Sequence, residues 1–445
     1  MLLPIAAVVL AIFVLIYLTI KIKFHPFFSL VASSFVFAIV AGMDWTTMLH
    51  AFSEGFGGTV ASIGVVIAIG TVIGSLLESS GASESMARSI LKITGKKHAS
   101  LGLAITGYFV SIPVFCDSAF VLLSSLAKRL SRDTQTSMTT MAVSLAMGLH
   151  ATHMLVPPTP GPLGVAGILK ADLGLVILFG AFVSIPVMIA GWLMALYFGK
   201  KYKFFPAETA EYGERDRIPG AAQSFLPIVA PIFLMLLGTV AALDSSPFGG
   251  GLPAKTIGIL GAPIVALLIG LAIALFTYHG MHPGDRNVWT FEGEFGQALK
   301  TAGQIVLIVG AGGAFGAVLK ASPLKDILVA HLSGLSIGIL APFIIGAIFR
   351  TTIGSGTVAM VTAASMLLPI IDMLGFNTPL GLVIAMLACA SGGFMVFHGN
   401  DDFFWVVSSA SGMEPNVAYR TLPVTSIVQS IVSMACTCAL YFIFF

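Results

Sequence analysis

The chain has 445 residues, of which 57% are hydrophobic and only 9% are charged. Soluble proteins carry about 25% charged residues, so this composition excludes a water-soluble globular protein and places the chain in a lipid bilayer. The net charge of +2 gives no indication of a nucleic-acid partner. The four cysteines form neither a zinc-binding pattern nor a disulfide framework, and we expect no cofactor.

In chain order, the hydrophobic runs predict a series of membrane-spanning helices, each needing roughly 20 apolar residues. Lysines follow the first run and do not precede it, so we expect it to remain as a helix and not to be a cleaved signal peptide. The continuous candidate spans are 2–20, 24–43, 58–78, 138–156, 173–199, 222–243, 256–278, 299–319, 379–397 and 418–444.

Two further hydrophobic stretches are interrupted in the middle. Residues 101–130 are broken at Ser111 to Ser118 (SIPVFCDS), and residues 334–374 at Arg350 to Thr357 (RTTIGSGT). Each stretch is either a pair of full spans or a re-entrant hairpin. Lys and Arg gather in cytoplasmic loops, and here they do so only if both stretches return to the side they left. The charge pattern therefore favours hairpins, with both termini in the periplasm.

The sequence also contains an internal repeat. A shift of about 240 residues aligns Ala68 to Ser80 with Gly310 to Ser322, including both glycines of a shared GxxxG. The same shift brings the two interruptions together, and it lays VPPTPGP over VFHGNDD, each a break in a helix. The alternative to a true repeat is that two helices rich in Gly and Ala resemble each other by chance.

From this repeat we predict an all-α polytopic membrane protein with two inverted-topology repeats, each containing a re-entrant hairpin and a broken helix. That arrangement is typical of secondary transporters, whose substrate site lies near the bilayer midplane. The predicted parts are a first repeat at 1–199 with its broken helix at 138–170, a cytoplasmic linker at 200–221, and a second repeat at 222–445 with its broken helix at 379–411.

Few ionisable residues lie at the breaks. Placing a charged side chain at mid-membrane costs about 2.5–3.5 kcal/mol, so each of them needs a reason. Asp117 opens the helix after the first interruption. It either caps that helix or carries a proton, because partial loss of water favours the protonated form of a carboxylate. Arg350 precedes a small-residue turn that opens a helix, a combination that binds anions. A structural salt bridge between Arg350 and an intramembrane Asp is the alternative.

The two helix breaks supply further polar groups. Prolines prevent a continuous helix at the first break and leave carbonyls free. His153 lies one turn away, whereas we interpret His150 as a packed, hydrogen-bonded side chain. We expect Asp401 to face the cavity and Asp402 to cap the following helix. The candidate substrate-binding residues are Ser111, Ser118, His153, Thr159, Arg350, Thr352, Gly354, Ser355, Gly356, Thr357, His398, Asn400 and Asp401, the candidates for proton coupling are Asp117 and Asp401, and no metal site is expected.

Four segments of the chain resemble the gluconate permease family. They are FCDSAFVLL (Phe115 to Leu123), HMLVPPTPGPL (His153 to Leu163), GSGTVAM (Gly354 to Met360) and HGNDDFFW (His398 to Trp405). Members of that family are proton symporters for gluconate and related sugar acids, with a D-serine branch, within the ion-transporter superfamily. The resemblance implies an elevator-type fold and a homodimer, in which the hairpins and broken helices move against a scaffold formed by the first spans of each half.

The resemblance also implies site residues at Asp117, at Pro157 to Pro162, and at Asn400 with Asp401. Arg350 is similar to the pattern of the sugar-acid branches. The chain departs from the family pattern after Asp401, where Asp402 and Phe403 replace small residues.

We therefore predict a proton-coupled importer of gluconate or a related sugar acid, a small hydroxylated organic anion, in the bacterial inner membrane. Arg350 and the hairpin amides and hydroxyls would hold the carboxylate, the second break and His153 would contact hydroxyls, and Asp117 would carry the proton. One alternative is a sodium- or proton-coupled carrier of another carboxylate, such as D-serine or a dicarboxylate. Others are a channel and an intramembrane aspartyl protease using Asp117 with Asp401, which the absence of a GxGD motif disfavours.

Overall fold

The computed structural model describes residues 3–206, 217–242, 247–249, 251–322, 338–399 and 401–444, and every regular element in these ranges is a helix. Asn400, the middle of the predicted linker and the start of the second predicted hairpin lie outside the described residues.

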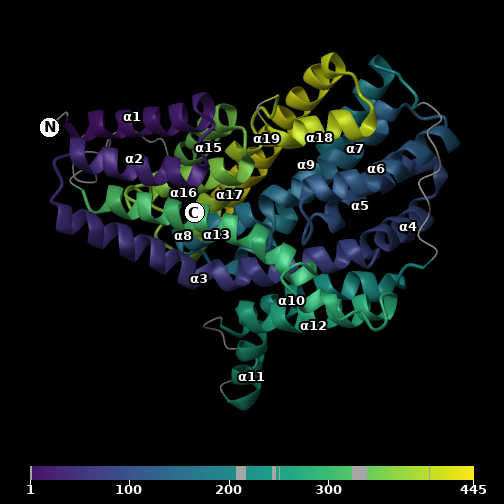
Figure 1. Ribbon diagram of the computed structural model, residues 1–445, viewed down its shortest axis with the longest axis horizontal. Helices are drawn as coiled ribbons and strands as arrows, with labels where there is room; N and C mark the ends of the chain where they lie inside the picture. The colour runs from purple at the N-terminus through teal and green to yellow at the C-terminus, as the bar shows by residue number, and fades with distance from the viewer. Residues whose placement is uncertain are drawn as a thin grey trace.

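The first half of the chain runs from the N-terminus to the linker (Figure 1). It contains α1 (Leu3–Ile16), α2 (Pro26–Val40), α3 (Trp45–Ser79), α4 (Ala82–Thr94), α5 (Ala99–Val110), α6 (Cys116–Asp133), α7 (Met138–Leu155), α8 (Pro160–Leu169) and α9 (Leu173–Lys201). The second half contains α10 (Ala221–Ala241), α11 (Leu252–Gly261), α12 (Pro263–Met281), α13 (Glu294–Lys320), α15 (Leu340–Ile353), α16 (Gly356–Leu367), α17 (Pro379–Gly393), α18 (Asp402–Ser411) and α19 (Pro415–Phe444).

Six helices in the described part of the chain are long and apolar enough to cross a membrane, namely α3, α9, α10, α12, α13 and α19. The span predicted at 256–278 is one helix, α12, but it begins later than predicted, because Pro263 separates it from the short α11. Proline donates no backbone hydrogen bond and restricts the residue before it, and Ala262 accordingly adopts an extended conformation. The runs at 24–43 and 379–397 form helices of only 15 residues.

The two interrupted stretches form pairs of short helices. In the first pair, α5 has 12 residues and α6 has 18. In the second pair, α15 has 14 residues and α16 has 12. The two helices of each pair pack against each other. All four are shorter than the roughly 20 residues of a spanning helix, so their lengths suit the arms of hairpins. We call α5–α6 the first hairpin and α15–α16 the second hairpin.

The two halves have the same order of elements from the hairpins onward. Each hairpin is followed by a broken helix, α7–α8 or α17–α18, and then by a long helix, α9 or α19. Corresponding helices begin 240 to 242 residues apart, at Ala99 and Leu340, Cys116 and Gly356, Met138 and Pro379, Pro160 and Asp402, and Leu173 and Pro415. This spacing agrees with the shift found in the sequence.

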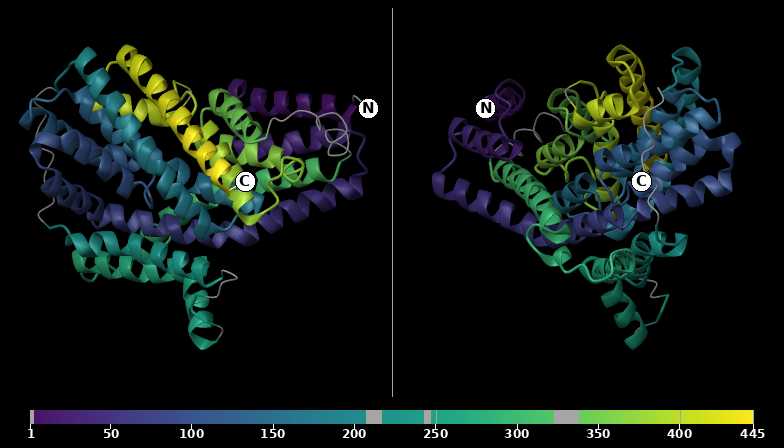
Figure 2. Two further views of the ribbon diagram at one scale, coloured as in Figure 1. Left: turned by 180° about the vertical axis from the view of Figure 1, so that it is seen from behind. Right: turned by 45° about the vertical axis from the view of Figure 1, so that its right-hand side comes forward.

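The long helices form a frame around the breaks. α3 packs along α13, and α9 lies beside α19, which runs diagonally across the back of the molecule (Figure 2). Each hairpin meets the broken helix of the other half, since α6 packs against α18 and α16 packs against α8. The hairpin tips and the helix breaks, which are far apart in the sequence, are thereby brought into one region.

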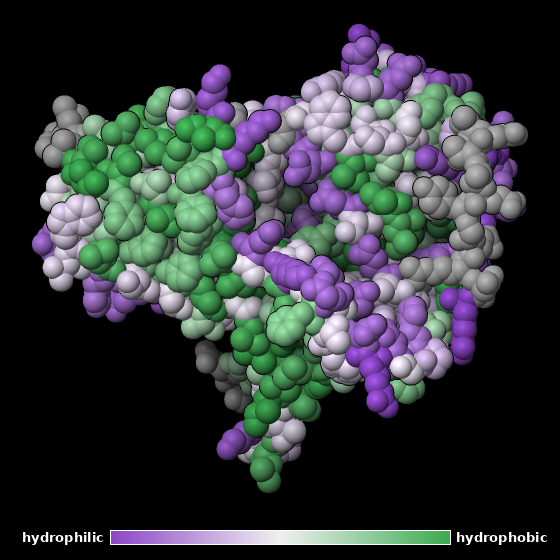
Figure 3. Space-filling view, viewed as in Figure 1, coloured by the Kyte–Doolittle hydropathy of each residue, from purple (hydrophilic) through white to green (hydrophobic). Residues whose placement is uncertain are grey.

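Large hydrophobic side chains cover much of the outer surface. They gather over α1 and α2 and over the projecting α11 (Figure 3). Val9 and Phe13 on α1 are each 62% exposed, and Leu252 on α11 is 81% exposed. Such a large exposed apolar surface would be unfavourable in water and is expected where lipid surrounds the protein.

Candidate functional site

Asp117 lies at the tip of the first hairpin. The turn after α5 contains Pro113, which interrupts helical pairing, and α6 begins at Cys116. No side chain caps the start of α6, so Asp117 stands in the first turn without the capping bond that was the alternative to a coupling role. Its Oδ1 is buried and has no hydrogen-bond partner among the described residues.

Arg350 lies at the tip of the second hairpin, in the last turn of α15, and is only 2% exposed. Gly354 adopts a φ of +87° and allows the chain to turn into α16. Arg350 Nη1 donates to the carbonyl of Gly354 and pairs with Asp401 Oδ2, while Nε has no partner among the described residues. The guanidinium also lies 5.7 Å from the ring centroid of Phe397.

Asp401 lies at the second helix break and serves two functions. Its Oδ1 accepts from the backbone amide of Phe403 at 2.7 Å, so it is the N-cap of α18, and its Oδ2 pairs with Arg350. The prediction that Asp402 caps this helix was wrong. The cap is the last residue before the helical backbone, and α18 already includes Asp402 in its first turn.

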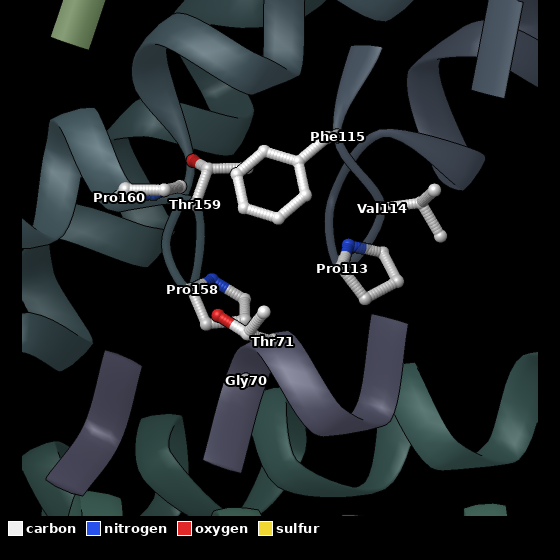
Figure 4. Close-up of a pocket in the computed structure, with 8 residues that line it drawn as sticks. All are labelled: Gly70, Thr71, Pro113, Val114, Phe115, Pro158, Thr159 and Pro160. Atoms are coloured by element: carbon white, nitrogen blue, oxygen red, sulfur yellow. The ribbon is translucent and has the colours of Figure 1, made fainter. Parts of the chain in front are cut away.

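The first helix break joins α7 to α8 through residues 156–159, including a cis peptide bond between Pro157 and Pro158. Pro113 at the hairpin tip and Pro158 at this break lie side by side above Gly70 and Thr71 of α3 (Figure 4). The space between them is only about 10 Å³, enough for one water molecule. Thr159 lines this small space, and its hydroxyl donates to the carbonyl of Val156 at 2.6 Å.

A larger cavity of about 250 Å³ lies between the hairpin tips, α7 and the second break. We call it the central cavity. It is lined by Phe115, Cys116, Asp117, His150, His153, Met154, Arg350, Ile353, Ser355, Gly356, Thr357, Asp401, Asp402 and Phe403.

The structure brings many of the predicted site residues to the central cavity and leaves others outside its lining. Those that line it are Asp117, His153, Arg350, Ser355, Gly356, Thr357 and Asp401. Those outside the lining are Ser111, Ser118, Thr159, Thr352, Gly354 and His398, while Asn400 is not among the described residues. Two of the hydroxyls outside are used locally, since Ser111 donates to Val114 O and Thr352 to Ile348 O.

Several lining residues had no binding role in the sequence interpretation, notably His150 and Met154. The signal for them was helical spacing, because positions 150, 153 and 154 share one face of α7. His150 is 2% exposed, and its Nδ1 lies 3.3 Å from Gln429 Oε1, as expected for a packed histidine. Its Nε2, however, has no partner among the described residues.

Unpaired polar atoms are concentrated around the central cavity. Asp117 Oδ1, His150 Nε2, His153 Nδ1 and Arg350 Nε are all buried without a hydrogen-bond partner in the described part of the chain. Leaving such a group unsatisfied costs about 1–3 kcal/mol, and more when it is charged. Four of them around one cavity indicate a site for a polar ligand. Within the described ranges, no three His, Cys, Asp or Glu side chains are placed to hold a metal ion.

Fold and site together define a class of protein. An all-helical membrane protein whose short hairpins and broken helices enclose a polar, buried cavity has the features of a transporter for a small polar molecule. The chain belongs to the GntP permease family, whose model matches residues 3–443.

Known proteins similar to this chain are permeases and transporters. An uncharacterized permease of Haemophilus influenzae is 39% identical, covering 92% of this chain and 86% of the relative. A gluconate permease of Pseudomonas aeruginosa is 32% identical, covering 94% and 93%. The D-serine transporter DsdX of Escherichia coli is 33% identical, covering 97% and 96%.

Among solved structures, the fold is similar to that of the YdaH transporter of Alcanivorax borkumensis, with a TM-score of 0.63 and 15% identity, covering 90% of this chain and 88% of that chain. This chain is therefore an integral membrane permease, and the family membership sets aside the intramembrane protease.

Proposed function

We propose that this permease is a proton-coupled carrier of gluconate or a related small sugar acid. The observation that carries the proposal is the buried Arg350 in a polar cavity with four unpaired polar atoms. The cavity volume of about 250 Å³ is below the roughly 300–1,000 Å³ of sites for drug-sized ligands, so it suits a small molecule.

The second hairpin offers the groups that a carboxylate needs. Arg350 Nε has no partner in the part of the chain that the structure describes, and a Cβ added at Gly356 would lie 3.5 Å from Arg350 Nη1, so the guanidinium adjoins the first residue of α16. The start of a helix presents free amides and a positive dipole end, which favour an anion. A substrate carboxylate here would share Arg350 with Asp401.

The other walls of the central cavity offer partners for hydroxyls and a carrier for a proton. His153, Ser355 and Thr357 line the cavity and supply donors and acceptors. Asp117 lines the same cavity and has a buried carboxylate oxygen without a partner within the described ranges. We assign proton binding to Asp117, because Asp401 already pairs with Arg350 and caps α18.

A carrier of D-serine is the second candidate. Asp117, Asp401 and Asp402 all line the central cavity, and a carboxylate there could bind the ammonium group of an amino acid. The 33% identity to a D-serine transporter adds to this possibility.

Uptake into proteoliposomes separates these candidates. Radiolabelled gluconate should accumulate when the outside is made acidic, and unlabelled gluconate should compete better than D-serine or a dicarboxylate. Replacing Na⁺ with choline at fixed pH should leave uptake unchanged. Preferential competition by D-serine would refute the sugar-acid assignment, and loss of uptake in choline would refute proton coupling.

We also infer that the two halves are inverted repeats and that the hairpins and broken helices move as an elevator along α3 and α13. In support, equivalent glycines meet different parts of the two hairpins. A Cβ added at Gly74 would lie 2.3 Å from Pro113 O, at the tip of the first hairpin. A Cβ added at Gly316 would lie 2.9 Å from Ser365 O, ten residues beyond the turn residue Ser355. At 1.5 Å per residue, this offset is about 15 Å along α16.

Equivalent residues on the second helices of the two hairpins, α6 and α16, also differ in how exposed they are. Val361 on α16 is fully buried, and a Cβ added at Gly312 would meet its side chain at 2.3 Å. The residue 240 positions earlier is Val121 on α6, which is 55% exposed. If the halves exchange environments during transport, Val121 packs against α3 in the opposite state while Val361 becomes exposed. The structure then represents one of two equivalent end states.

The remaining assignments rest on the charge pattern and the family resemblance. We propose a location in the bacterial inner membrane with both termini in the periplasm, since this places most Lys and Arg in the cytoplasm. We further propose a homodimer whose scaffold includes α3 and α13. Native mass spectrometry of the purified protein tests the dimer, and labelling of terminal cysteines in intact cells tests the orientation.

A further inference from the structure

We propose that His150 is a specificity-determining residue whose Nε2 accepts a hydrogen bond from a substrate hydroxyl, and that Gln429 holds the imidazole in the form that accepts it. This inference rests on the proposed function, because it concerns the same central cavity. It assigns a binding role to a side chain whose pattern in the sequence indicated only packing.

The orientation of the Gln429 amide is fixed by two carbonyls. Gln429 lies on α19 and is fully buried. Its Nε2 donates to Met147 O at 2.9 Å and to Val187 O at 3.2 Å. Because carbonyl oxygens only accept, the amide nitrogen must face them, and Oε1 therefore faces His150 Nδ1 at 3.3 Å.

The amide oxygen of Gln429 in turn determines which tautomer the imidazole of His150 adopts. Gln429 Oε1 can only accept, so His150 Nδ1 carries a hydrogen and donates it. In a neutral imidazole the other nitrogen is then an acceptor. The guanidinium of Arg350 lines the same cavity, and a second cation beside it would be repelled, so we assign the neutral ring. His150 Nε2 is therefore an acceptor with no partner among the described residues.

Three phenylalanine rings hold the imidazole in place. Their centroids lie 4.9 Å from it for Phe394, 5.2 Å for Phe397 and 6.2 Å for Phe403. The lone pair on Nε2 lies in the plane of the ring, so a fixed ring gives it a fixed direction. A rigid acceptor of this kind discriminates better than a flexible one, since it does not turn away to another partner.

The chemistry of the ligand follows from the acceptor. A carboxylate oxygen cannot satisfy Nε2, because it also only accepts. A hydroxyl can, and a hydroxylated acid held at Arg350 brings hydroxyls into the same cavity. An analogue that lacks the hydroxyl would leave Nε2 buried and unpaired, which is the condition under which polar sites reject ligands most strongly.

Calorimetric binding of gluconate and its monodeoxy analogues to the purified full-length protein tests the inference. In the wild type, at least one deoxy acid should bind about tenfold more weakly than gluconate. His150→Phe keeps a ring of similar shape without nitrogen. It should bind gluconate about tenfold more weakly and should no longer distinguish that deoxy acid from gluconate. His150→Gln, which can present an amide oxygen, should recover part of the discrimination, and His98→Phe, at an exposed position, should match the wild type.

A His150→Phe variant that distinguishes the deoxy acids as the wild type does would overturn the inference and leave the proposed function standing. Absence of binding of any hydroxylated acid by the wild type would overturn both. A second measurement does not depend on folding of the variants. In ¹⁵N-histidine-labelled wild-type protein, His150 should carry its hydrogen on Nδ1, and a hydrogen found on Nε2 instead would equally refute the assignment.

Discussion

Substitutions at Arg350 can separate its effect on substrate binding from its effect on the stability of the protein. In the wild type, its guanidinium donates to the carbonyl of Gly354 and pairs with Asp401, while Nε has no hydrogen-bond partner among the described residues. Arg350→Lys keeps the positive charge but replaces a planar fork with a single ammonium group. The ammonium can retain the pair with Asp401, but it cannot also contact the hairpin carbonyl and a substrate carboxylate in the geometry of the fork.

The size of the effect follows from the bond that is lost. A hydrogen bond to a charged group contributes about 1.5–3 kcal/mol, and each 1.4 kcal/mol corresponds to a factor of ten. We therefore expect Arg350→Lys to weaken gluconate binding by about 10- to 150-fold, and to lose less thermal stability than Arg350→Met because the pair with Asp401 is kept. Arg350→Met should in addition destabilise the protein by about 3–5 kcal/mol, because it leaves Asp401 as an unpaired buried charge.

Isothermal titration calorimetry and thermal unfolding in the same detergent measure both quantities. Adding Asp401→Asn to Arg350→Met should restore most of the stability without restoring binding, since Asn also caps helices well. Arg420→Lys, the same exchange at an exposed position on α19, is the matched control. If Arg350→Lys binds gluconate as tightly as the wild type does, Arg350 does not hold the carboxylate.

Two further predictions concern coupling and movement. Asp117→Asn should abolish pH-driven accumulation in proteoliposomes yet retain exchange of internal for external substrate, whereas Asp133→Asn, at the exposed end of the same helix, should retain both activities; pH-driven accumulation in Asp117→Asn would remove the coupling role. Gly74→Ala places a methyl group 2.3 Å from Pro113 O and should disfavour the state described here, lowering maleimide labelling of a cysteine at Val121. Gly316→Ala brings a methyl group only to 2.9 Å from Ser365 O in the same state and should lower this labelling less, and labelling equal to the wild type in both variants would argue against the elevator.

Much of the site could be predicted because its signals are local. Pro113 interrupts a helix wherever it occurs, and the glycines after Arg350 force a turn, so both hairpin tips can be located from the residues alone. A charge inside the membrane is costly, so the few charged residues at these breaks indicate a candidate site. Asp117, Arg350 and Asp401 were found in this way, and all three line the central cavity.

Other features could not be predicted, because they depend on which side of a helix faces which neighbour. The Thr352 hydroxyl bonds to its own helix, while Thr357, five residues on, lines the cavity. Asp401 and Asp402 are chemically identical, and only the start of α18 decides which of them caps it. His150 acquires an accepting nitrogen because Gln429, 279 residues away, approaches its other side.

The sequence by itself therefore determined three things: that the chain is a membrane protein, at which residues its helices break, and which charged groups lie at these breaks. These properties follow from the cost of charge in lipid and from the backbone restrictions of proline and glycine, which act within a few residues. Only the tertiary structure decided which polar atoms are left without a partner around a common cavity. Pairing of buried polar groups depends on contacts between elements hundreds of residues apart, and those contacts form only when the two halves pack together.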